Sequence, residues 1–174
     1  MRRLGVDQID LFQLHRIDPL VPLADQVGEF ANLREEGKIV SVGLSQVTVD
    51  QLEQARSIVE IASVQSRYNI GDRDTQDVLD VCSRDKITFI PWVPMAQGRL
   101  DADSGVLADI ARAHDVEVGP IALAWLLAVS EVMVPIPVPL AVTIWRSSRR
   151  PPSSSSTSRS APCPPRPRVD LTWN

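Results

Sequence analysis

A histidine and an arginine stand at the end of the first apolar run of the chain. Residues 9–14 read Ile-Asp-Leu-Phe-Gln-Leu, and His15 and Arg16 follow them. The aliphatic and aromatic residues of this run are typical of a buried strand. In parallel α/β proteins ligands bind where the strands end. His15 is therefore either a catalytic histidine or a strand-end histidine hydrogen-bonded to a loop, and the run alone leaves both interpretations open.

Apolar runs and helical patterns alternate along the chain. The predicted strands are residues 9–14, 39–45, 61–65, 87–92 and 132–137. Helical spacing covers residues 23–36, 48–59, 72–82, 106–111 and 121–129. The expected boundary residues are Gly37 as a C-cap, Thr48 as an N-cap with Gln51 as its capping-box partner, Asp72 or Asp74 as a helix start, and Pro120 as the start of the last, apolar helix.

This alternation predicts the fold class. Each strand–helix unit takes about 20–30 residues, which is the βα repeat of a parallel sheet. The strands are apolar on both faces, as strands buried between two layers must be. The pattern therefore predicts an α/β protein with a barrel-like or open parallel sheet. A complete (β/α)₈ barrel has eight strands and needs about 250 residues. Five predicted strands in 174 residues are too few for one.

Composition divides the chain into two unlike segments. Residues 1–138 carry 12 basic and 21 acidic side chains, whereas residues 139–174 carry six arginines and one aspartate. We expect residues 1–138 to fold and residues 139–174 to form a disordered Pro/Ser/Arg-rich tail. The tail lacks the interleaved aromatics of a specific nucleic-acid site. Nothing in the sequence predicts a metal site or a membrane span, and two distant cysteines weakly favour a cytoplasmic protein.

The folded segment resembles the aldo-keto reductase family. Six motifs in the family's order and spacing carry the resemblance, which ends at residue 137. They are residues 3–16 (RLGVDQIDLFQLHR), 36–39 (EGKI) with 43–45 (GLS), 64–69 (VQSRYN), 90–95 (IPWVPM), 122–127 (ALAWLL) and 135–137 (PIP). The resemblance implies part of a (β/α)₈ TIM barrel, with the five predicted strands as strands four to eight of the family's barrel.

The resemblance also implies a site for NADPH and a carbonyl substrate. His15 takes the place of the family's catalytic histidine, which hydrogen-bonds the substrate carbonyl. Ser45 and Gln65 match the residues that hold the nicotinamide carboxamide, and Trp92 matches the aromatic that stacks on the ring. The loop of residues 93–100 matches the one that wraps the pyrophosphate. Its implied cofactor-binding residues are Pro94, Met95, Gln97 and Gly98.

The sequence departs from the family's pattern at three places. Gln46 and Val47 replace the Asn-aromatic pair that usually follows the Gly-Leu-Ser motif. The family's acid tyrosine, with its lysine and aspartate, belongs to three βα units that would precede Met1. Tyr68, the one tyrosine, matches another position and is assigned to packing or cofactor contact.

The third departure is the end of the resemblance after Pro137. The family continues with Gly-Thr-Ser and a basic helix that contact the 2′-phosphate of NADPH. Codons can be chosen for residues 138–148 that, read one frame over together with the preceding proline codon, encode Gly-Thr-Ser-Arg-Arg-Asp-His-Leu-Glu-Glu-Leu. The tail is therefore interpreted as a frameshifted helix.

These observations together predict a fragment of an NADPH-dependent aldo-keto reductase that is inactive alone. The alternatives are a non-catalytic cofactor-binding or scaffold relative and a decayed gene product. Open strand edges at residues 9–14 and 132–136 predict self-association. The sequence does not indicate which aldehyde or ketone is the substrate, or whether another chain supplies the missing units.

Overall fold

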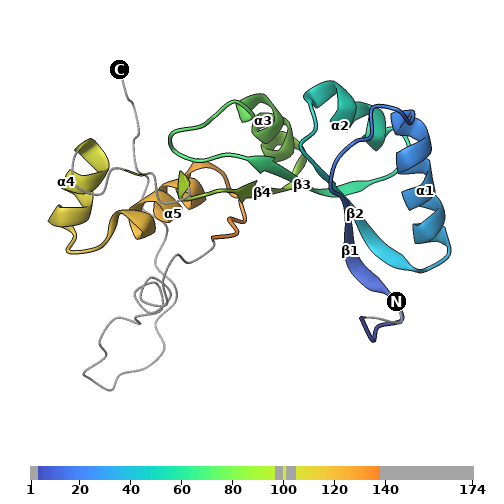
Figure 1. The fold of residues 1–174 in the computed structure, drawn as a ribbon, viewed down its shortest axis with the longest axis horizontal. Helices are drawn as coiled ribbons and strands as arrows, with labels where there is room; N and C mark the ends of the chain where they lie inside the picture. Colours follow the sequence, from blue (N-terminus) through green and yellow to red (C-terminus); the bar gives the residue numbers. More distant parts are fainter. Residues whose placement is uncertain (1–3, 97–99, 101–104, 138–174) are drawn as a thin grey trace.

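A parallel sheet forms the structure, and its first three helices pack on one side of it (Figure 1). The computed structural model describes residues 4–96, 100 and 105–137. Its strands are hydrogen-bonded in the order β1-β2-β3-β4. The elements are β1 (Ile9–Leu14), α1 (Leu23–Glu35), β2 (Ile39–Ser45), α2 (Val49–Arg56), β3 (Ile61–Arg67), α3 (Gln76–Asp85), β4 (Thr88–Trp92), α4 (Gly105–Ala113) and α5 (Val118–Val129). The predicted alternation of strands and helices is confirmed.

Local sequence explains where the first two helices end and begin. Gly37 follows α1 with φ +71°, a left-handed conformation that glycine adopts without steric cost. Thr48 caps α2 through a complete capping box: its hydroxyl accepts from Gln51 N, and the Gln51 side chain accepts from Thr48 N. Both boundary predictions are confirmed.

The predicted start of α3 at Asp72 or Asp74 is wrong. The helix begins at Gln76, after the N-cap residue Thr75. Asp72 is engaged elsewhere, because its backbone exchanges two hydrogen bonds with Asn69 and its carboxylate pairs with Arg67 Nε at 2.8 Å. A residue held in this bridge cannot also cap the helix. The apolar helix α5 likewise begins at Val118, ahead of the predicted Pro120.

The fifth predicted strand is reduced to a single parallel bridge. Met133 pairs with Phe89, and the backbone N–H of Phe89 and of Val134 each donate a hydrogen bond of 2.8 Å across this bridge. The next donor on β4 would be residue 91, which is a proline without an N–H. Only a 3.5 Å bond from Ile136 N to Pro91 O follows. Residues 132–136 therefore run beside β4 without forming a full strand.

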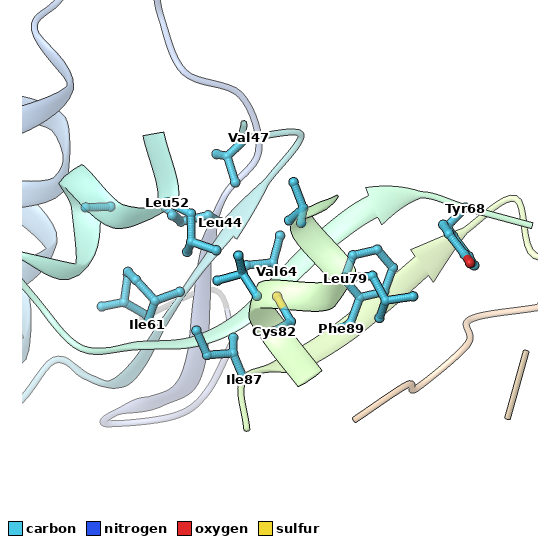
Figure 2. Packing of buried hydrophobic residues seen from close by; sticks show 14 of the residues in the cluster. Leu44, Val47, Leu52, Ile61, Val64, Tyr68, Leu79, Cys82, Ile87 and Phe89 are labelled. Carbon is cyan, nitrogen blue, oxygen red and sulfur yellow. The ribbon is translucent and has the colours of Figure 1, made fainter. Parts of the chain in front are cut away.

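The hydrophobic core lies between the sheet and helices α1, α2 and α3. Leu14, Leu44, Val64 and Phe89 share one row of the sheet, and the last three are fully buried. Figure 2 shows how Leu44, Val64 and Phe89 of this row meet side chains from the helices. The labelled helix side chains in that view are Leu52 from α2 and Leu79 and Cys82 from α3. Burial of each large aliphatic side chain contributes about 1.5–3 kcal/mol.

The opposite face of the sheet is polar at its centre. Gln13 on β1 donates a hydrogen bond of 2.9 Å to Ser63 Oγ on β3, and this bond passes over Gly43 on the intervening β2. A Cβ at Gly43 would lie 2.5 Å from Ser63 Oγ and 2.6 Å from Gln13 Cγ. Glycine at this position therefore makes room for a hydrogen bond between two strands that are not neighbours.

The proposed tail of residues 139–174 and its boundary at residue 138 lie outside the described residues. Among the described helices, none has the length and apolar character needed to cross a membrane.

Gly43→Ala should destabilise the fold by about 1–3 kcal/mol, because the new methyl group displaces Gln13 or Ser63 and breaks their hydrogen bond. Urea unfolding followed by circular dichroism measures this change. Gly28→Ala on α1 is the matched control: nothing lies within 4 Å of the added Cβ. It should stabilise the helix by about 0.5–1 kcal/mol. Equal effects of the two substitutions would contradict the described packing at Gly43.

Cys82 should be chemically inert in the folded chain. The thiol is fully buried, and burial raises its pKa to about 12, so the reactive thiolate is scarce at neutral pH. In a Cys163→Ser background, an aromatic disulfide reagent at pH 8 should react with Cys82 only as fast as the protein unfolds, and at once in urea. Immediate reaction of the native protein would show that α3 does not cover the thiol.

Candidate active site

The register of the strands brings three predicted site residues together at the carboxyl ends of β1, β2 and β3. Leu14 pairs with Leu44, and Ser45 pairs with Gln65. His15, which follows Leu14, is therefore next to Ser45 in the same row. Since Leu44 and Val64 face the helices, alternation turns Ser45 and Gln65 to the opposite face. Ser45 is buried, Gln65 is partly buried and His15 is exposed, which gives a hydroxyl, a carboxamide and an imidazole at one strand edge.

Trp92 ends β4 on the same face as Gln65. Gln65 pairs with Ile90, and Trp92 lies two positions beyond Ile90, paired with Arg67. The indole is partly buried, and the Arg67 guanidinium lies over the ring at 5.9 Å from its centroid. This places a flat aromatic surface beside the polar strand ends.

The loop after Trp92 is only partly described. Pro94 and Met95 are buried, and the Met95 sulfur would lie 3.3 Å from a Cβ built at Gly119, so Met95 packs against the start of α5. Gln97 and Gly98 lie outside the described residues. The four predicted pyrophosphate contacts of this loop therefore stay predictions.

Gln46 connects three strand ends, which sequence reasoning did not foresee. Its backbone N–H donates to Gln65 O at 2.9 Å. With its carboxamide oxygen turned toward the neighbouring donors, that oxygen accepts from Arg67 N at 2.8 Å and from Trp92 Nε1 at 2.5 Å. The sequence offered one signal: a polar side chain directly after Ser45, which was noted only as a departure from the family's pattern.

Tyr68 belongs to the core on the helix side of the sheet. Its ring lies edge-on to Phe89 and stacks on Trp125 at a centroid distance of 6.0 Å. Its hydroxyl donates to Gln76 Oε1, and burial raises its pKa. A phenol that is buried, engaged and harder to ionise is suited to packing, which agrees with one of the two roles predicted for it.

No group of three or more metal-ligating side chains is found in the described part of the chain. The strand register places hydrogen-bonding groups and an aromatic ring in the candidate site. Such a set can hold a planar, amide-bearing ligand and polarise a carbonyl.

Curated proteins and solved structures of one kind are similar to this chain. An uncharacterised oxidoreductase of Schizosaccharomyces pombe is 47% identical over 137 residues, which are 79% of this chain and 45% of that protein. Pyridoxine 4-dehydrogenase of Escherichia coli is 32% identical, over 79% of this chain and 50% of its own length. The chain thus spans about half the length of these curated relatives.

Solved structures of aldo-keto reductases also superpose on this chain. A thermostable aldo-keto reductase, crystallised with the inhibitor epalrestat, superposes with a TM-score of 0.76 at 31% identity, over 83% of this chain and 54% of that one. An aldo-keto reductase from Klebsiella pneumoniae, crystallised with NADPH, superposes with a TM-score of 0.70 at 27% identity, over 82% and 52%. This confirms the predicted partial barrel. The sequence model described as "Aldo/keto reductase family" matches residues 1–140, and the chain belongs to this family.

Proposed function

We propose that the chain supplies the nicotinamide-binding half of an NADP-dependent oxidoreductase that interconverts carbonyl and alcohol groups. One observation carries this proposal: the register aligns His15, Ser45 and Gln65 at one edge of the sheet, with Trp92 on the face that Ser45 and Gln65 share. The NADPH complex of the Klebsiella relative supports the choice of cofactor.

The side chains present fit the nicotinamide group. A carboxamide both donates and accepts hydrogen bonds, and Ser45 and Gln65 offer both functions side by side. Trp92 offers a ring for stacking. Orientation of the ring by these residues decides which of its faces points to the substrate.

His15 is the residue we assign to the substrate. Its imidazole donates a hydrogen bond to the carbonyl oxygen and orients it, while the bound nicotinamide supplies a hydride to the carbonyl carbon. Residues 93–100, with Pro94, Met95, Gln97 and Gly98, hold the pyrophosphate in this proposal. Backbone N–H groups of such loops bind anions well.

The sequence contains one tyrosine, Tyr68, that could be the proton donor. By resemblance the donor is a tyrosine assisted by a lysine and an aspartate, and Tyr68 is buried and bonded to Gln76. We therefore propose that residues 1–174 by themselves bind cofactor without turning over substrate. The burial of Tyr68 equally favours the second candidate, a non-catalytic relative that binds the cofactor only.

NADPH should bind the purified chain, and Gln65→Leu should weaken binding about tenfold, because loss of a buried hydrogen bond to the carboxamide costs about 1–2 kcal/mol. Titration calorimetry measures both affinities. Gln54→Leu, an exposed glutamine on α2, is the matched control and should bind as the unchanged chain does. Reduction of simple aldehydes should stay at background for the chain and for His15→Ala alike.

Two outcomes would contradict this account. If NADPH did not bind, or bound equally well after Gln65→Leu, the assignment of the site would be wrong. If aldehydes were reduced at an ordinary enzymatic rate of about 1–10³ s⁻¹ and His15→Ala abolished this, the chain would contain its own acid.

We also propose that the chain associates with itself through its sheet edges. Within the described residues β1 pairs only with β2, and Leu11 and Phe12 are each 38% exposed. At the other side, Val134 is 51% exposed and Ile136 is 43% exposed. Apolar segments at the two sides of an open sheet can pair with another chain.

Leu11→Lys should reduce self-association, because a charge on an edge strand opposes further pairing. Size-exclusion chromatography across a concentration series should show a concentration-dependent size for the unchanged chain and a smaller size for the variant. Leu20→Lys, in a loop where Leu20 is 90% exposed, is the control and should elute as the unchanged chain does. A monodisperse monomer at every concentration would refute the proposal.

A further inference from the structure

The indole of Trp92 is held both at its edge and on one face. At its edge, the Nε1–H donates to the Gln46 carboxamide oxygen at 2.5 Å when the oxygen and nitrogen of that amide are exchanged, the orientation in which both atoms find partners. On one face lies the Arg67 guanidinium, which the Asp72 carboxylate fixes at 2.8 Å. These contacts come from the ends of β2 and β3, so the ring of β4 is oriented by its neighbouring strands.

Backbone strain at both ends of this hydrogen bond is the second observation. Gln46 has φ +55° and Val93, which follows Trp92, has φ +57°. The left-handed region is unfavourable for most side chains and most of all for β-branched ones. Asn69 Nδ2 holds the strained peptide by donating to Val93 O at 3.1 Å. Such strain persists only where surrounding contacts over-determine the conformation, and it gathers at ligand sites.

The strained backbone places Gln46 where its carboxamide can reach Trp92. In an extended continuation of β2, residue 46 would follow the alternation of the strand and turn toward the helix side, as Leu44 does. With φ +55° the chain leaves that alternation. The carboxamide oxygen then spans from β2 to β4 and also accepts from Arg67 N of the β3 end. One side chain thus joins the carboxyl ends of three strands.

We propose that Gln46 is a positioning residue that orients Trp92 for stacking on the nicotinamide ring. This inference rests on the proposed function for the identity of the ring. It assigns Gln46 a contact with Trp92 in place of a direct contact with the cofactor. Gln46 stands where the family usually has an asparagine, and its longer side chain can reach the indole N–H of Trp92.

The test compares variants that remove or keep the acceptor oxygen. Gln46→Met has a similar length without an acceptor, and Gln46→Glu keeps the acceptor. Gln46→Asn withdraws the oxygen and tolerates the left-handed backbone, so it should fold even if Gln46→Met does not. With ¹⁵N-labelled tryptophan, and the Trp92 signal assigned by Trp92→Phe, solvent exchange of the indole N–H is measured without cofactor. NADPH affinity is then measured for each variant.

Exchange of the Trp92 indole N–H should be at least about tenfold faster in Gln46→Met and Gln46→Asn than in the unchanged chain, and Gln46→Glu should retain protection. NADPH binding should weaken in the same order, while Gln54→Met changes neither quantity. Equal exchange in all variants would overturn the hydrogen bond. Faster exchange with unchanged NADPH affinity would overturn the positioning role. Protected exchange in an unchanged chain that binds no NADPH would instead refute the proposed function and leave Gln46 a purely structural contact.

Discussion

The in-register parallel pairing of β1 to β4 is the constraint on which the candidate site depends. Hydrogen bonds between parallel strands align Leu14, Leu44, Val64 and Phe89 in one row that the helices cover. The next row is then determined, since side chains alternate between the faces. Ser45 and Gln65 thus turn away from the core at the edge where the chain leaves the sheet. A shift of one residue in any strand would bury the polar side chains and expose the core.

Much of this arrangement could be predicted, because it follows from local patterns. The spacing of apolar residues predicted β1 to β4. Thr48 and Gln51 predicted the start of α2. The errors arose where tertiary contacts compete with local signals. Asp72 has the chemistry of an N-cap, but Arg67 and Asn69 occupy it. Residues 132–137 have the composition of a strand, but Pro91 on the neighbouring strand lacks the donor that a full ladder needs.

The candidate site also has residues that could be predicted and contacts that could not. Motifs predicted His15, Ser45, Gln65 and Trp92, and the register gives them one common edge. The role of Gln46 could not be predicted, because it depends on a left-handed backbone conformation and on an acceptor that reaches across two strands. The hydrogen bond between Gln13 and Ser63 over Gly43 is another contact of this kind. Both form between residues far apart in sequence, where spacing along the chain carries no information.

The central claim is that the carboxyl ends of these strands hold a nicotinamide cofactor. Two-dimensional ¹H–¹⁵N spectra of the labelled chain, recorded during titration with NADPH, test it most directly. The account predicts saturable shifts at Ser45, at Gln65 and at the indole N–H of Trp92, with unchanged signals at Ile39 and Ile61 near the opposite ends of their strands. Shifts at those opposite ends, or no shifts at saturating NADPH, would contradict it.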